Sequence, residues 1–105
     1  MIKLTVLIPT TYNNGDEVQK ETFQRLENQL LEIAGGYTIE GVVEGGWVDK
    51  DGTIYKDKSK KYSIITDEAK LSKIKETITK IGKELKQKSV YLEVFKTEVN
   101  FLEIE

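Results

Sequence analysis

The sequence predicts an α+β, ferredoxin-like fold, in which two helices pack on one face of a four-stranded antiparallel sheet. Two observations favour it. Apolar residues recur at period two in four segments and at helical spacing in two others. The segments follow the order strand, helix, strand, strand, helix, strand, which in a small chain is typical of the split βαβ sandwich. With 105 residues, we expect a single ferredoxin-like domain over residues 1–105.

The chain begins with a strand and a polar loop. Residues 2–8 alternate in polarity and are rich in β-branched side chains, which predicts a strand. Pro9, the only proline, is expected to end it because proline donates no ladder hydrogen bond. Residues 10–16 are types that favour turns and loops.

A helix is expected over residues 17–34, with Asn14 or Asp16 as its cap. Gly35 and Gly36 should end it, because glycine adopts the left-handed C-terminal cap at little cost. Its apolar stripe consists of Val18, Thr22, Leu26, Leu30 and Ile33.

Residues 37–49 and 52–66 predict a β-hairpin. The first of these strands contains interior glycines, which often mark a bulge or an edge strand. The tetrapeptide 49–52, Asp-Lys-Asp-Gly, has the residue types that a tight hairpin turn needs.

The last third of the chain predicts a helix over residues 67–88 and a strand over residues 89–104. Asp67 is the expected helix cap. The helix has a narrow apolar seam of Leu71, Ile74, Ile78, Ile81 and Leu85. The strand is apolar on both sides, with Tyr91 and Phe95 opposite Val90 and Leu92.

The apolar residues on both sides of this strand indicate the character of the sheet face that the helices leave open. An antiparallel sheet whose open face meets water should be polar there. Tyr91, Phe95 and Trp47 suggest instead that something covers this face. A second copy of the chain is the simplest cover, so we expect a homo-oligomer, most simply a homodimer.

Composition argues against several classes of protein. The chain has no Cys and no His, which removes disulfides, thiolate nucleophiles, and the commonest general base and metal ligand. The net charge of −2 argues against nucleic acid as the main partner. We expect no cofactor, no resident metal, no membrane segment and a cytoplasmic location.

Two charged stretches have a structural and a functional interpretation. Asp49-Lys50-Asp51-Gly52 resembles the start of a calcium loop, but its glycine comes too early and position twelve is Lys60, so a hairpin turn is favoured. The lysines between Lys56 and Lys61 could contact phosphates, but such alternation is also typical of a solvated strand.

Candidate binding residues fall into two groups. The loop offers Thr10, Asn14 and Asp16, although a strand-to-helix turn needs the same residue types. The aromatic group, Trp47 with Tyr55 and Tyr62, is compatible with a core, an interface or the wall of a small-ligand site.

The strings "IPTTYNNGDEV", "GGYT", "GGWVDKDGTIYKDKSKKY" and "QKSVYLEV" resemble a family of small uncharacterised prokaryotic proteins. The shared pattern is Gly-Gly-aromatic-Thr, then Gly-x-Trp-x-Asp-x-x-Gly and Asp-x-Ser. The resemblance covers nearly the whole chain, implies a stand-alone ferredoxin-like domain and supplies no activity. It points to Thr10, Asn14, Gly36, Thr38, Trp47, Asp49, Gly52, Tyr55, Asp57 and Ser59.

The sequence therefore favours a non-enzymatic homo-oligomer that binds a protein or a small ligand at its open sheet face. In register, the hairpin would place Trp47, Tyr55, Asp57 and Ser59 on one face. The alternative is a small dimeric enzyme that acts on a small molecule through the Asn13–Asp16 loop with Tyr55 and Asp57.

Overall fold

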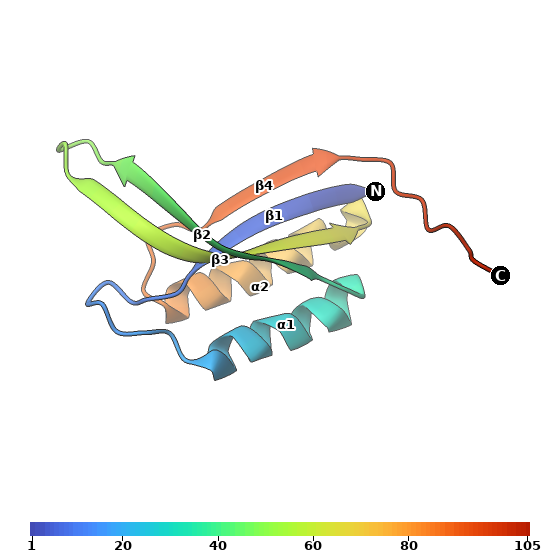
Figure 1. Cartoon of the computed structure of the whole chain (residues 1–105), viewed down its shortest axis with the longest axis horizontal. Helices are drawn as coiled ribbons and strands as arrows, with labels where there is room; N and C mark the ends of the chain where they lie inside the picture. Colours follow the sequence, from blue (N-terminus) through green and yellow to red (C-terminus); the bar gives the residue numbers. More distant parts are fainter.

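The computed structural model describes residues 1–105 and shows the expected element order. The strands are β1 (Ile2–Pro9), β2 (Thr38–Val48), β3 (Ile54–Thr66) and β4 (Tyr91–Lys96). The helices are α1 (Lys20–Ala34), the single 3-10 turn η1 (Glu68–Lys70) and α2 (Leu71–Glu84). The sheet has the order β2-β3-β1-β4 and every pairing is antiparallel. Both helices lie on one face of the sheet (Figure 1), so the predicted ferredoxin-like fold is confirmed.

The core lies between the helices and one face of β1 and β3. Period two places alternate residues of β1 on the helix side, and these side chains are buried. The α2 seam is buried as predicted except for Leu71, which is partly buried and packs at the margin. An ion pair between Arg25 and Glu84 joins the surfaces of α1 and α2. The central buried side chains are Leu4, Val6, Ile8, Leu26, Leu30, Tyr62, Ile64, Ile74 and Leu85.

The prediction for the start of α1 was wrong by three residues. Glu17 forms a bridge with Thr11, and the Val18 amide donates to the Thr10 carbonyl, so this stretch continues the loop. Gln19 occupies the cap position and makes no side-chain cap bond. The predicted C-terminal cap is confirmed, because Gly35 has φ 82° and its amide donates to the Leu31 carbonyl.

The second half of the chain also differs from the prediction at element ends. α2 is preceded by the 3-10 turn, and Asp67 makes no side-chain cap bond. β4 ends at Lys96 rather than at residue 104, because β1 offers pairing partners only as far as Ile2. Residues 97–105 continue as an extended segment that projects away from the body (Figure 1).

The β2–β3 hairpin also projects beyond the helices (Figure 1). The predicted irregularity in β2 is confirmed: the register shifts between Ile39 and Val42, where Gly41 adopts φ 99°. On the helix side of the outer hairpin, Val48 and Ile54 pair with each other and are exposed, because neither helix reaches them.

These two projections give the chain an unusually large surface. A compact monomer of this mass exposes roughly 6,000 Å², whereas this chain exposes 7650 Å². Its radius of gyration is 15.0 Å, against about 13 Å for a compact domain of this length. Neither α1 nor α2 has the length and the apolar character of a transmembrane helix.

Candidate functional site

The tip of the hairpin is a turn organised by Asp49. Its Oδ1 accepts hydrogen bonds from the amides of Asp51, at 2.9 Å, and Thr53, at 3.0 Å. Gly52 adopts φ 83°, a conformation that favours glycine. Desolvation alone would raise the pKa of Asp49, but the hydrogen bonds from these backbone amides outweigh it. The pKa of Asp49 is therefore lowered. The Gly52 amide also donates to the Asp49 carbonyl at 3.1 Å, and the Asp49 amide donates to the Thr53 carbonyl at 3.0 Å, so the geometry is that of the predicted turn.

Two aromatic rings stack on the open face of the hairpin next to this turn. Trp47 and Tyr55 are cross-strand partners, and their ring centroids lie 4.3 Å apart at an interplanar angle of 13°. The Trp47 indole donates to Asp57 Oδ2 at 3.0 Å. Gly45 is the cross-strand partner of Asp57 and carries no side chain, so the indole reaches this diagonal neighbour. The predicted register of the hairpin is therefore confirmed.

The polar groups of this cluster are already engaged with one another. The Tyr55 hydroxyl donates to Asp49 Oδ2 at 3.1 Å. That hydrogen bond and the charge of Asp49 raise the pKa of Tyr55, so its hydroxyl is a weaker acid than a free phenol. The Asp57 carboxylate accepts the indole N–H. The cluster thus forms an aromatic surface whose polar groups bond to one another, and Trp47 remains 53% exposed.

Ser59 shares the open face by register but lies deeper than the aromatic residues. It pairs with Pro9 of β1 and Val43 of β2 and is buried. Ser63 and Thr5, which pair with each other farther along the sheet, are buried too. Small hydroxyl side chains, together with the Leu7–Lys61 pair, therefore line the centre of the open face, and the aromatic residues lie toward its margins.

β4 forms the opposite margin of the open face. Tyr91 pairs with Leu7 and Phe95 pairs with Lys3, so both rings lie on the side away from the helices. Tyr91 is 55% exposed and Phe95 is 44% exposed. The Tyr91 hydroxyl lies 3.3 Å from Glu93, whose charge raises the pKa of Tyr91. These rings have no covering element within the chain.

The structure separates the loop candidates from this aromatic surface. The Thr10 amide and hydroxyl both donate to the Lys58 carbonyl, at 3.0 and 3.1 Å. Asn14 Oδ1 accepts the Asp16 amide at 3.0 Å, and Asn14 Nδ2 donates to the Asp16 carboxylate at 3.0 Å. These residues build the turn between β1 and α1, and no hydrogen bond joins them to Tyr55 or Asp57.

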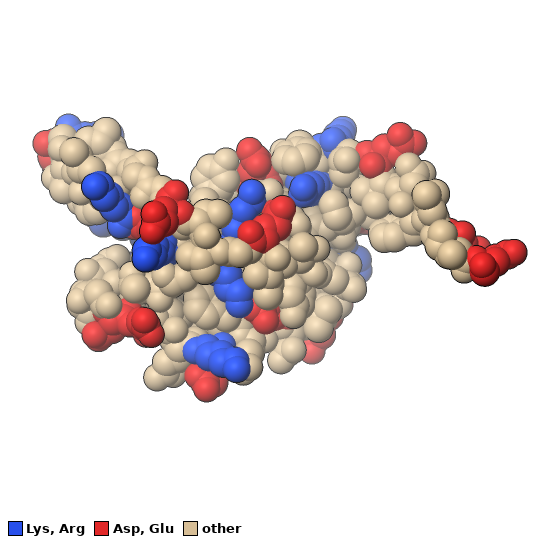
Figure 2. Space-filling view, viewed as in Figure 1, with Lys and Arg blue, Asp and Glu red and all other residues tan.

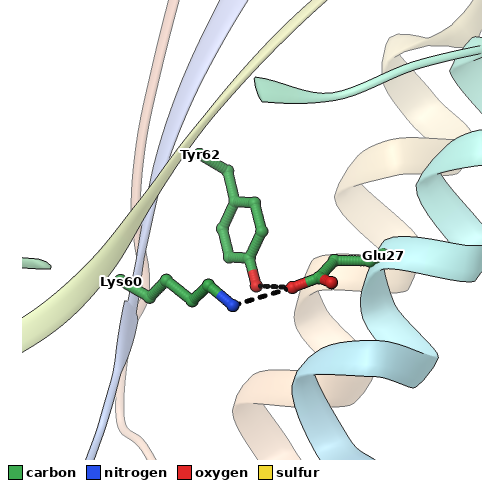
Figure 3. A network of polar contacts seen from close by, with 3 residues as sticks. All are labelled: Glu27, Lys60 and Tyr62. Atoms are coloured by element: carbon green, nitrogen blue, oxygen red, sulfur yellow. Dashed lines mark hydrogen bonds and ion pairs between the residues drawn. The ribbon is translucent and has the colours of Figure 1, made fainter. Parts of the chain in front are cut away.

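A polar network that the sequence did not predict lies on the helix side of the sheet (Figure 3). Glu27 Oε2 of α1 accepts the Tyr62 hydroxyl at 2.6 Å and the Lys60 ammonium at 2.9 Å. The ammonium group also lies 5.0 Å from the centroid of the Phe23 ring. The sequence held one sign of this network: Lys60 and the core residue Tyr62 lie two residues apart on β3, so their side chains lie on the same face of the sheet.

The electrostatics of this network favour one protonation state. Burial opposes ionisation of Glu27, but the hydrogen bonds from Tyr62 and Lys60 outweigh it, so the pKa of Glu27 is lowered. Burial, together with the hydrogen bond to Glu27, raises the pKa of Tyr62 well above its usual range. The network is therefore a carboxylate held by a neutral phenol and an ammonium group, which ties α1 to β3.

The lysines of β3 are largely matched by carboxylates rather than gathered in a basic patch. Basic and acidic side chains intermingle on the face shown in Figure 2. This arrangement does not present the continuous basic surface that phosphate binding uses. The ion pairs are Lys58–Glu44 at 3.6 Å, Lys60–Glu27 at 2.9 Å and Lys61–Glu40 at 3.9 Å.

Several proteins of known structure share the fold of this chain. No protein-family model and no curated protein matches this sequence. The periplasmic divalent cation tolerance protein CutA from Archaeoglobus fulgidus is 13% identical, with a TM-score of 0.71 over 96% of this chain and 88% of that chain. CutA1 from Pyrococcus horikoshii is 19% identical, with a TM-score of 0.67 over 95% and 87%.

A phage SAM lyase, solved with S-methyl-5'-thioadenosine, resembles this chain to the same degree. It is 12% identical, with a TM-score of 0.70 over 90% of this chain and 80% of that chain. The proteins with this fold therefore include both cation tolerance proteins and an enzyme. At these identities, the similarity establishes that this chain shares their fold.

Proposed function

We propose that this chain is a non-enzymatic binding domain that self-associates through its open sheet face. The single observation that carries the proposal is the uncovered set of aromatic rings at both margins of that face. Trp47 and Tyr55 lie on the hairpin, and Tyr91 and Phe95 lie on β4. Exposed apolar patches rimmed by polar residues are typical of interaction sites, and Tyr, Trp and Phe are enriched there.

The surface area supports association with another copy. The chain exposes 7650 Å², which is roughly 1,700 Å² more than a compact monomer of its mass. A standard interface buries about 800 Å² per partner. An interface of this size over the open face and the projecting hairpin would therefore remove about half of the surplus area. A closed symmetric assembly is the expected arrangement, and a homodimer is the simplest.

The catalytic alternative, acting through Tyr55, Asp57 and the Asn13–Asp16 loop, is less well supported. The polar groups of Tyr55 and Asp57 are bound to Asp49 and Trp47. The depression beside them, of about 530 Å³, has no apolar lining residue and is formed by Glu44, Gly45, Gly46, Lys56, Asp57 and Lys58. Ligand sites are usually concave and lined mainly by apolar side chains.

The chain offers few of the usual ligands for a divalent cation: it has no His or Cys, and no three of its carboxylates form a cluster suited to a metal ion. The location in the cytoplasm stays a prediction, since one relative in fold is described as periplasmic.

Trp47, the only tryptophan, is a built-in reporter of the proposed interface. We expect quenching of its fluorescence by acrylamide to increase roughly twofold or more when the protein is diluted from tens of micromolar to low nanomolar, because dilution favours dissociated chains. The circular dichroism of the protein should stay unchanged over the same range. A quenching constant independent of concentration would contradict the proposal.

A further inference from the structure

A groove between α2 and the outer edge of β4 is separate from the open face. Its volume is about 380 Å³. Ile78 of α2 and Leu92 of β4, together with Val90, supply its apolar side chains. Its lysines are Lys75, Lys83 and Lys88, and none of the three forms an ion pair in this structure.

The strand beside this groove has a free edge. β4 is the last strand in the sheet order and pairs only with β1. Its outer amide and carbonyl groups are therefore available to another extended segment, and adding a strand to such an edge is a common mode of peptide recognition. The groove thus offers backbone partners, an apolar floor and positive charge.

The C-terminal arm, residues 97–105, has the complementary chemistry. It is extended and projects from the body (Figure 1). Phe101 is 82% exposed and Ile104 is 89% exposed, although side chains of this size are normally buried. Its charged residues are all acidic: Glu98, Glu103 and Glu105.

We propose that the arm of one copy docks in the α2–β4 groove of a second copy. The arm adds a strand to β4, its apolar side chains cover the groove floor, and its glutamates face the three lysines. Within one chain, the Thr97 amide is bonded to the Met1 carbonyl, which directs the arm away from the groove at the other end of β4. The proposal rests on the self-association proposed above but uses a different surface.

Engineered thiols test this contact in the full chain, which contains no cysteine of its own. Thr79 of α2 also lines the groove. Chains carrying Ile104→Cys on the arm are mixed with chains carrying Thr79→Cys and oxidised mildly. A disulfide forms only where the two thiols approach closely. We expect the mixed 79–104 product, identified by mass, at a yield at least about tenfold above that of a random encounter, because docking raises the effective concentration.

The matched control uses a chain carrying Leu31→Cys in place of the chain carrying Thr79→Cys. Leu31 is an exposed residue of α1 outside the groove. Adding Lys83→Glu and Lys88→Glu to the Thr79→Cys chain should reduce the yield to the control level. Equal yields for positions 79 and 31 would overturn the proposed docking. If the 79–104 product forms while Trp47 quenching stays independent of concentration, the open-face proposal fails and the arm contact stands.

Discussion

Replacing Phe95 by glutamate is expected to weaken self-association by roughly 100-fold or more. In the separate chain the new carboxylate would lie opposite Lys3, so an oppositely charged cross-strand pair should preserve the fold. In the associated state the same carboxylate would be buried against a second copy. Losing the burial of a phenyl ring costs about 1.5–3 kcal/mol, and burying a poorly paired charge adds to it. Because each 1.4 kcal/mol changes the affinity tenfold, a total loss near 3 kcal/mol corresponds to the expected weakening of roughly 100-fold.

The matched control is Leu31→Glu, which makes a comparable apolar-to-acidic change on the outer side of α1. Sedimentation velocity over a range of concentrations should show that Leu31→Glu associates like the unmodified chain, while Phe95→Glu dissociates at concentrations at which Leu31→Glu remains associated. Equal weakening in both variants would mean that added negative charge, rather than the open face, controls association. An unaffected Phe95→Glu variant would show that β4 does not take part in the interface.

Replacing Glu27 by glutamine is expected to lower the free energy of unfolding by about 1–3 kcal/mol at neutral pH. The change removes the negative charge that pairs with Lys60 and weakens the hydrogen bond with the buried Tyr62 hydroxyl. Removing one member of a largely buried polar pair has a cost of this size. Urea denaturation measures this difference in the free energy of unfolding. The dependence of that free energy on urea concentration should have the same slope in both proteins.

The same substitution makes a pH prediction with a definite sign. The pKa of Glu27 is lowered below its ordinary value of 4.5 in the folded chain. The ionised carboxylate therefore stabilises the fold above that value, and the contribution is lost as the pH falls through the folded-state pKa. The stability difference between the unmodified chain and Glu27→Gln should be constant near neutral pH and shrink below 4.5.

The control for both measurements is Glu84→Gln, which breaks the exposed ion pair with Arg25. Surface pairs of this kind contribute about 0–1 kcal/mol, so a small change is expected. A Glu27→Gln variant no less stable than Glu84→Gln, or a difference that grows in acid, would contradict the assigned network.

Several features were predictable because local and tertiary preferences agree. The alternation in residues 2–8 predicts β1, since those same side chains fill the core. The seam from Ile74 to Leu85 predicts α2 for the same reason. The turn at Asp49–Gly52 sets the parity of both hairpin strands, which is why the pairing of Trp47 with Tyr55 followed from the sequence.

Other features depend on information that no local pattern carries. The loop continues to Gln19 because Glu17 and Val18 bond to Thr11 and Thr10, contacts that outweigh helix propensity. Residues 97–105 have the alternation of a strand but lie beyond the end of β1, so no neighbour is present to pair with them.

The Glu27–Lys60 pair joins residues that are distant in the sequence. The lysines between Lys56 and Lys61 look alike as a sequence, and Lys60 differs because it lies on the helix side of β3 within reach of Glu27 of α1. A polar contact of this kind needs the relative placement of a helix and a strand, which periodicity alone does not provide.

The masses of the unmodified protein and of the Phe95→Glu variant at tens of micromolar, measured side by side, test the central claim most directly. The claim is that the open sheet face, bordered by Trp47, Tyr55, Tyr91 and Phe95, is an interface between copies of this chain. Light scattering coupled to size-exclusion chromatography should give the unmodified protein as a single species of at least twice 12.0 kDa, and Phe95→Glu at a lower mass. A species of 12.0 kDa at every concentration would contradict it.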